Sequence, residues 1–464
     1  MKGRGITLIT GLLSRIPGLG GADGRFLLSR GAGDLMARVL GVGLGLLWVL
    51  ILVRLLGPDE YGRFVYLLSA TFFISLLGSL GMPVVASLYV ARYNRTPGRA
   101  RLITFIGFAV AAAIIGPIVA SLGLRTVVDW FDGHMFDNFN LLLVLGFSAA
   151  SALVQLFAAV DRAVERAVQG AVVEQILQRV FALGVVGGLL WLGAPADANA
   201  ALAGSFSGAL IAALLMALIA KPALRSRHGP GRFSGRPRRA LRLVPRWMRR
   251  AMVMMITPVY FLVVSETDIL MLGTFLPPAA VGIYHVARRL AGFMRFVYTG
   301  VNAVGIHRLA AAHMERDKER LQGLVDGMGW IGLAPAIGLM LVFLLIGPWL
   351  LGIFGPEMRT GYAVLLILSA TALIEMSLGP ATELLMMTGH EKLVGRINLL
   401  FAGVNVAFNA ALIPVFGMEG AAIASGLSVI AWKITLARKA WTLLGVQCFV
   451  LTRSPFRVAK ELKR

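Results

Sequence analysis

Apolar runs of about 20 residues recur along the whole chain, which is the length a helix needs to cross the roughly 30 Å hydrocarbon layer of a membrane. Short polar, glycine- or proline-containing breaks separate them. The alternating pattern of a membrane β-strand is absent, which leaves α-helices. The pattern predicts an all-α, polytopic membrane protein with about twelve transmembrane helices, at residues 34–56, 64–90, 102–124, 139–160, 172–192, 199–220, 251–273, 280–304, 327–354, 361–388, 394–415 and 418–442.

The composition agrees with a membrane protein. Of the 464 residues, 58% are apolar and the mean hydropathy is +0.79, whereas soluble domains are roughly 45–50% apolar. The single cysteine, Cys448, excludes a disulfide framework and any cysteine-based metal site. No metal and no cofactor is expected.

The net charge of +22 is carried by segments between the spans. Because basic segments resist translocation, the loops rich in Lys and Arg are expected in the cytosol. They are 1–33, 91–101, 221–250, 305–325 and 443–464. The loop 125–138 carries three aspartates instead and is expected outside. An even number of spans then places both termini in the cytosol.

The segment 221–250 has eleven Lys or Arg and no acidic residue, and it falls midway along the chain. It is expected to be a cytosolic linker that fixes orientation and contacts anionic lipid. Nucleic acid is not expected as a partner, because stacking aromatics are not interleaved with the charges. The predicted domains are a tail at 1–33, a six-helix bundle at 34–220, the linker at 221–250, a second six-helix bundle at 251–442 and a tail at 443–464.

Two breaks in the apolar pattern have a similar outline, "RLLGPDEYGRF" at 54–64 and "TFLPPAAVGIY" at 274–284. A shift of 220 positions pairs Pro58 with Pro278 and Gly62 with Gly282. The same shift pairs "ALAGSFSGAL" at 201–210 with "AAIASGLSVI" at 421–430. With the midway linker, these matches predict an internal repeat of two parallel halves, and transporters place substrate sites at such repeat interfaces. Each break is expected to be an external turn set by Pro and Gly.

The first break, the segment "ETDILMLGTFLPPAAVGIYHVARRLA" around the second, and the late segment "TGHEKLVGRINLLFAGVNVAFNAALIPVFGMEGAAIASGLS" resemble bacterial polysaccharide-unit flippases of the Wzx-like type. This family belongs to the multidrug/oligosaccharidyl-lipid/polysaccharide (MOP) exporter superfamily. The resemblance covers nearly the whole chain and implies a MATE-like fold of two bundles. The chain departs from the pattern at Pro277, where a glycine is usual.

The resemblance also implies a function. The substrate would be an oligosaccharide repeat unit on undecaprenyl pyrophosphate, moved from the cytosolic to the periplasmic leaflet of the bacterial inner membrane by alternating access. The product would serve lipopolysaccharide O-antigen, capsule or exopolysaccharide synthesis. Implied partners are membrane lipids, H⁺ or Na⁺ as a coupling ion, and polysaccharide polymerase or export machinery.

Charged side chains inside predicted spans are costly and therefore point to function. In the eighth span, polar residues follow steps of three and four and predict one polar helix face, at His285, Arg288, Gly292, Arg295, Thr299 and Asn302. Arg288 and Arg295 are candidate cavity cations for the pyrophosphate, since the planar guanidinium matches phosphate oxygens. The alternative is pairing between helices, with Asp268 of the seventh span facing Arg288.

Other spans add polar candidates. Asp268 and Glu375 are candidates for a proton or sodium-ion coupling site, and Arg179 of the fifth span is a candidate cavity cation. Amides suit sugar hydroxyls because they donate and accept hydrogen bonds, but they also join helices in membranes. The amide candidates in the eleventh span are Asn398, Asn405 and Asn409. Lys433 either reaches the cytosolic surface or faces inward.

No catalytic motif is found: the six histidines are dispersed and there is no phosphate-binding glycine loop. A transporter rather than an enzyme is therefore expected, driven by a gradient or by the membrane potential. The alternatives are a cation-coupled multidrug antiporter of the same superfamily, which would favour an anionic cavity, and a membrane polysaccharide polymerase or ligase, which would favour a large external loop. A receptor or structural protein would not explain duplicated halves.

Overall fold

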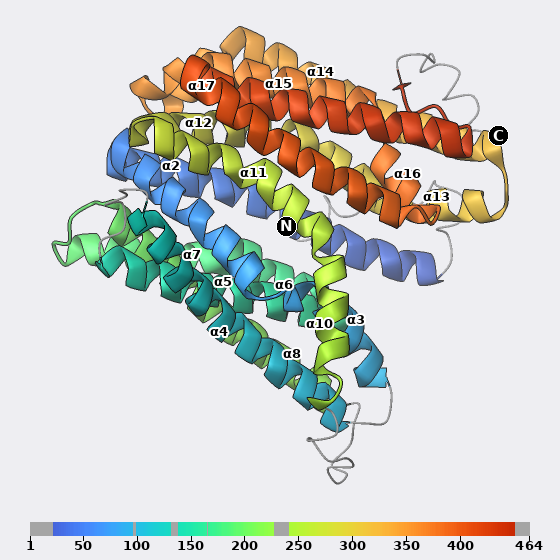
Figure 1. The fold of residues 1–464 in the computed structure, drawn as a ribbon, viewed down its shortest axis with the longest axis horizontal. Helices are drawn as coiled ribbons and strands as arrows, with labels where there is room; N and C mark the ends of the chain where they lie inside the picture. Colours follow the sequence, from blue (N-terminus) through green and yellow to red (C-terminus); the bar gives the residue numbers. More distant parts are fainter. Residues whose placement is uncertain (1–21, 96–98, 131–137, 165, 227–240, 451–464) are drawn as a thin grey trace. The chain divides into compact units, whose positions relative to one another are not determined.

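The computed structural model describes residues 22–95, 99–130, 138–164, 166–226 and 241–450, and every regular element in these ranges is helical (Figure 1). Residues 1–21 and 451–464 of the predicted tails, residues 227–240 of the basic linker and residues 131–137 of the loop 125–138 lie outside the described residues, whereas residues 22–33, predicted as tail, are helical. The chain divides into two compact units, one of residues 1–49 and 74–255 and the other of residues 50–73 and 256–464.

Helix α2 supplies segments to both units. It runs from Ala22 to Gly78, and Gly57, with φ of 75° and ψ of 173°, divides it into two helical segments. The remaining elements of the first unit are α3 (Met82–Arg95), α4 (Arg99–Trp130), α5 (Asn138–Ala163), α6 (Ala167–Val172), the π-helical turn η1 (Val173–Leu177), α7 (Gln178–Trp191), α8 (Ala198–Ser226) and α10 (Val244–Met254).

An aromatic cluster anchors α10 in the first unit. Trp247 is fully buried and donates a hydrogen bond from Nε1 to the Tyr93 hydroxyl at 3.0 Å. Its ring also meets the Phe105 ring edge to face, with centroids 5.1 Å apart. The end of the predicted linker is therefore a short helix with a buried tryptophan, and its exposed face carries Arg246, Arg249 and Arg250.

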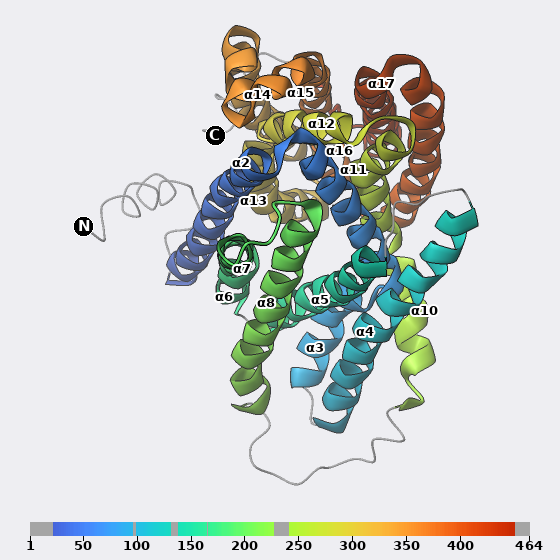
Figure 2. The ribbon, with the colours of Figure 1, turned by 90° about the vertical axis from the view of Figure 1, so that its left-hand side faces the viewer.

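The second unit continues from Ile256. Its elements are α11 (Ile256–Phe275), α12 (Pro278–Ala291), α13 (Met294–Met314), α14 (Lys318–Phe354), the 3₁₀ turn η2 (Pro356–Gly361), α15 (Tyr362–Ser377), α16 (Ala381–Met387) and α17 (Glu391–Leu444). Figure 2 shows α17 as two helical arms that run back along each other. The arms meet at Gly417, where φ is 60°, and they are joined by the bond from Ser428 Oγ to the Phe401 carbonyl.

Three predicted spans are broken helices. The seventh divides at Met255 into α10 and α11, and the eighth divides at Gly292 and Phe293 into α12 and α13. The tenth divides between α15 and α16, where Gly379 has φ of 59° and is followed by Pro380. The single straight helix expected for 280–304 was wrong, because a tight turn at Gly292 separates Arg288 from Arg295.

In the described part of the chain, eight helices are long and apolar enough to cross a membrane, or nine if the bent pair of residues 43–78 and 82–94 counts as one span. The helix α17 counts once here although it contains two of the predicted spans. A polytopic helical membrane protein is confirmed. The number twelve and the membrane orientation stay predictions.

The two similar breaks pack directly on each other within the second unit. A Cβ on Gly62 would collide with the carbonyl group of Pro278, and a Cβ on Gly282 would lie 2.8 Å from the carbonyl oxygen of Pro58. Glycine is required at both positions because another backbone approaches there. Residues 50–73 thereby belong to the same compact unit as the second half of the chain, although the sequence assigns them to the first bundle.

Candidate functional site

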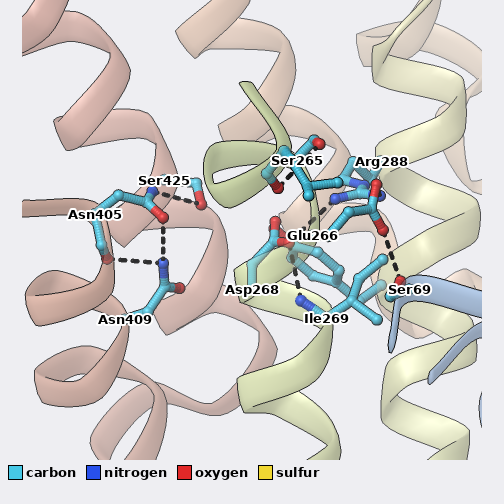
Figure 3. Close-up of polar contacts among 11 residues, drawn as sticks. Ser69, Ser265, Glu266, Asp268, Ile269, Arg288, Asn405, Asn409 and Ser425 are labelled. Carbon is cyan, nitrogen blue, oxygen red and sulfur yellow. Dashed lines mark hydrogen bonds and ion pairs between the residues drawn. The ribbon is translucent and has the colours of Figure 1, made fainter. Parts of the chain in front are cut away.

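The centre of the polar site is an arginine held between two carboxylates of the neighbouring helix (Figure 3). Arg288 of α12 lies 3.1 Å from Asp268 Oδ1 and 3.5 Å from Glu266 Oε1, both on α11. The Asp268 side chain is 2% exposed and that of Arg288 is 22% exposed. Of the two alternatives for Arg288, pairing between helices is the one seen in this structure.

Further hydrogen bonds fix both carboxylates. Tyr284 donates its hydroxyl hydrogen to Asp268 Oδ2 at 2.5 Å, and the Ile269 backbone N–H donates to Oδ1 at 2.8 Å. Ser69 of α2 donates to Glu266 Oε2 at 2.6 Å. A buried carboxylate is stable only when its oxygens are satisfied in this way. The site therefore joins α2, α11 and α12 into one hydrogen-bonded group.

The ring of His285 extends this group toward the first break. Its Nδ1 lies 2.7 Å from the hydroxyl oxygen of the buried Tyr61, which precedes Gly62 on α2. Arg289, exposed on the same helix as Arg288, lies within electrostatic range of Glu266. Two arginines thus face two carboxylates, so the cluster is close to charge neutrality.

The amides of α17 form the other side of the network. Asn409 Nδ2 donates to the Asn405 backbone carbonyl at 2.9 Å, and Asn405 Nδ2 donates to Ser425 Oγ at 3.4 Å. Both amides are fully buried. In this structure they join helices, and a role toward sugar hydroxyls stays a prediction that requires them to become accessible.

Asn398 is also buried and is engaged within α17. Its Oδ1 accepts a hydrogen bond from Trp432 Nε1 at 2.9 Å, which ties the two arms of the helix together. The adjacent Lys433 is 2% exposed, and its Nζ lies 5.5 Å from the centroid of the Trp432 ring and 5.8 Å from that of the Tyr298 ring. Of the two alternatives for Lys433, the structure shows the inward one, with cation–π contacts.

Arg295 differs from Arg288 in exposure. It lies on α13 and its Nη2 is 2.8 Å from Glu375 Oε2 of α15, yet 49% of its side chain is exposed, against 17% for Glu375. The turn at Gly292 lets the two arginines bond to different helices. The side chains of Thr299 and Asn302, the rest of the expected polar face, lie outside those described.

Arg179 belongs to the first unit and bonds to backbone carbonyls. Its Nη1 donates to Gly41 at 2.5 Å and to Gln175 at 2.6 Å, so it connects α2 with the π-helical turn before α7. A Cβ on Gly41 would collide with the Gln175 side chain, which shows how closely the two elements pack. A cavity role for Arg179 stays a prediction.

Several buried or partly buried polar residues were not among the candidates. Glu266 lies two positions before Asp268 and carried the same signal, a charge inside an apolar run. Tyr284 had no distinguishing signal, since its hydroxyl becomes relevant only through its contact with Asp268. Asp326 of α14 and Asp161 of α5 are each at most 1% exposed. Asp161 directly follows the predicted span 139–160 and stands next to Arg162. Asp326 directly precedes the predicted span 327–354 in glycine-rich sequence. Neither therefore stood out as a charge inside a span.

The fold is that of a multi-pass transporter of the MOP superfamily. The solved structure of "Lipid II flippase MurJ, inward closed conformation" aligns with 92% of this chain and 89% of that chain, with a TM-score of 0.68 and 11% sequence identity. Solved MATE multidrug transporters share the fold. Likeness at this identity establishes the fold, which confirms the expected MATE-like architecture.

The family follows from the sequence comparison. The family model described as "Polysaccharide biosynthesis protein" matches residues 33–309, more than half of the chain, and the chain belongs to this family. This confirms the resemblance to the Wzx-like branch and the expectation of a transporter family rather than an enzyme family.

Two curated relatives are archaeal proteins of Haloferax volcanii. "Probable low-salt glycan biosynthesis flippase Agl15" is 21% identical over 402 residues, which cover 85% of this chain and 79% of Agl15. "Probable flippase AglR" is 29% identical over 181 residues, which cover 38% of this chain and 37% of AglR. The match to AglR therefore spans little more than a third of that protein's length.

Proposed function

We propose that this protein is a flippase for a lipid-linked glycan, which it moves across the membrane during polysaccharide biosynthesis. Membership of the polysaccharide biosynthesis family supports the proposal, and so do the names of the two archaeal relatives as probable flippases. The finer form of the proposal is an undecaprenyl-pyrophosphate-linked repeat unit moved to the periplasmic leaflet of a bacterial inner membrane for a surface polysaccharide.

The observation that carries the proposal is the half-exposed Arg295. It stands inside a predicted span and keeps 49% of its side chain exposed although Glu375 holds it in place. A half-exposed guanidinium can meet an incoming anion, and its planar fork matches phosphate oxygens. Asp268 and Glu266, by contrast, are both paired with Arg288. These carboxylates are therefore less available to bind the organic cation that a multidrug antiporter would transport.

The transport cycle is alternating access, in which the glycan headgroup passes through the protein while the polyprenyl chain stays in lipid. With the cell interior negative, outward movement of a net anion is favoured by about 2.3 kcal/mol per charge per 100 mV. Proton or sodium coupling at Asp268 and Glu375 stays a prediction, as does association with polymerase or export machinery.

Replacing Arg295 tests the proposal. In a strain whose surface glycan depends on this protein, Arg295→Ala should lower surface glycan at least about tenfold, the effect of losing about 1.4 kcal/mol of headgroup interaction, while Arg295→Lys retains part of it. The control is Arg320→Ala, which removes an exposed arginine paired with Glu315 at the start of α14. Membrane protein levels are measured by immunoblot. Full glycan export by a normally inserted Arg295→Ala protein would contradict the proposal.

A further inference from the structure

Asp161 is a buried carboxyl group without a hydrogen-bond partner. It stands near the end of α5 in the first unit and its relative exposure is 0%. Neither of its carboxylate oxygens makes a hydrogen bond. The backbone of Gly170 covers it so closely that a Cβ there would lie 3.1 Å from Asp161 Oδ2. A charge buried in this manner is very costly, whereas a neutral carboxylic acid is far less so.

A cation lies close to Asp161 but is committed to another group. Arg166, at the junction of α5 and α6, is within electrostatic range of Asp161, yet its Nη1 donates to the backbone carbonyl of Ile219 on α8 at 2.6 Å. The backbone N–H of Arg166 donates to the Asp161 carbonyl at 2.8 Å, which keeps the two residues adjacent. Arg166 is therefore the cation that could exchange the Ile219 carbonyl for the carboxylate.

The other charged groups around Asp161 do not neutralise it. Arg162, the second cation in electrostatic range, is exposed on α5. On the helices packed against α5, the basic residues whose side chains are described are exposed: Arg92 on α3, Arg101 on α4 and Lys221 on α8. Helix α6 has no charged residue, and Glu174 of the adjoining π-helical turn is half-buried.

We propose that Asp161 is a proton-binding site that switches the junction between α5, α6 and α8. With the proton bound, the acid is neutral and Arg166 bonds the Ile219 carbonyl, as in this structure. When the proton dissociates to water, the carboxylate forms an ion pair with Arg166. The hydrogen bond from Arg166 to the Ile219 carbonyl of α8 is then lost. The carboxyl O–H is the only covalent bond that forms or breaks. The other change is the exchange of the hydrogen bonds of Arg166.

This switch would supply the coupling ion of the transport cycle, an extension that rests on the proposed flippase function. Asp268 and Glu375 are weaker candidates in this structure because each is held by an arginine. Of the three, Asp161 is the one with both oxygens buried and without a hydrogen bond, and Arg166 beside it is bonded to a backbone carbonyl instead. The site and its coupling role are tested separately.

Dicyclohexylcarbodiimide tests the site without any transport. It adds to protonated carboxyl groups in apolar surroundings, and mass spectrometry of the purified full-length protein locates the adduct. We expect labelling of Asp161 at low pH that falls about tenfold for each pH unit above the midpoint. Arg166→Gln removes the partner of the carboxylate and should shift the midpoint to higher pH. No adduct at Asp161 at any pH, or a midpoint unmoved in Arg166→Gln, would overturn the proposal.

Proteoliposomes test the coupling. The probe is undecaprenyl pyrophosphate carrying one fluorescently labelled sugar, and its transport is followed with and without a pH gradient. Asp161→Asn, which mimics the neutral acid, should transport the probe without acceleration by the gradient, whereas Glu315→Gln, which changes a carboxylate of an exposed ion pair, should keep the acceleration. Transport by the wild type that ignores the gradient would overturn the coupling role. A wild type that moves no probe would count against the flippase, and the labelling result would still decide the proton site.

Discussion

At the scale of single residues, the charges inside the second unit are arranged to satisfy each other. Arg288 bridges Glu266 and Asp268, while Tyr284 and the Ile269 N–H complete the shell of Asp268. Such buried pairs contribute little net stability compared with apolar side chains, but breaking one partner is costly because the other charge remains buried. The pair therefore fixes how α11 and α12 pack more than it adds to stability.

Removing the shared arginine tests this view. Arg288→Met should destabilise the purified protein by about 3–5 kcal/mol, because Glu266 and Asp268 lose their common cation. The double variant Arg288→Met/Asp268→Asn should regain part of that loss. Denaturation in mixed micelles, followed by circular dichroism, measures the difference. Arg320→Met serves as the control, since an exposed pair contributes only about 0–1 kcal/mol. Equal stability of the single and double variants would argue against the pair.

At the scale of helices, breaks decide which side chains meet. The turn at Gly292 sends Arg288 to α11 and Arg295 to α15, and the turn at Gly417 folds α17 back so that Asn398 meets Trp432. The break between α15 and α16 accommodates the segment after α17, because a Cβ on Gly379 would lie 2.6 Å from the Cys448 carbonyl oxygen. At Gly417 and Gly379 the backbone φ is positive, a conformation that glycine adopts at the least cost.

The crossing of the two similar breaks gives a prediction for α2. Gly62→Ala should destabilise the protein by about 1–3 kcal/mol, the cost of overpacking, because its Cβ would meet the rigid backbone of Pro278. The matched control is Gly43→Ala in the same helix, where a Cβ meets no atom within 4 Å. That change should stabilise α2 by about 0.5–1 kcal/mol. Thermal denaturation in detergent compares the two, and a neutral Gly62→Ala would disprove the tight crossing.

At the scale of the whole molecule, the hydrophobic pattern was sufficient to predict a helical transporter fold, and its motifs were sufficient to predict the family. It could not predict the pairing partners of Arg288 and Arg295, because the turn at Gly292 has a nearly helical backbone and leaves no mark in an apolar pattern. Asp161 escaped for a related reason. A carboxylate beside two arginines at a helix end is usually solvated, and only the packing of Gly170 shows that it is buried.

The segment that directly follows α17 can be used to test whether the second unit is intact. Gln322 of α14 donates from Nε2 to the Gln447 carbonyl at 2.7 Å and accepts from the Gln447 N–H at 2.8 Å. These bonds hold the segment after α17, which contains the only cysteine of the sequence, and Cys448 is 2% exposed. It lies beyond the last candidate span, and burial raises the pKa of its thiol to about 12.

Native Cys448 should therefore react slowly with a maleimide at pH 7, because the reactive thiolate is scarce and covered. Gln322→Ala removes the two hydrogen bonds to this segment, worth together about 1–3 kcal/mol, so labelling should quicken about tenfold or more. Labelling of the denatured protein sets the upper limit, and Gln169→Ala in α6 of the first unit is the control. Native labelling as fast as in the denatured protein would show that the segment is not held.

The contact between Gly62 and Gly282 also constrains how this sequence can change over evolutionary time. Each copy of the repeat presents its glycine to the backbone of the other, so a larger residue in either copy would require the other copy's turn to move. The neighbouring positions have no such constraint: at the shift of 220, Asp59 and Glu60 correspond to Ala279 and Ala280. Even where the two halves share little sequence similarity, the residue at each of these two positions therefore remains constrained by the backbone of the other turn.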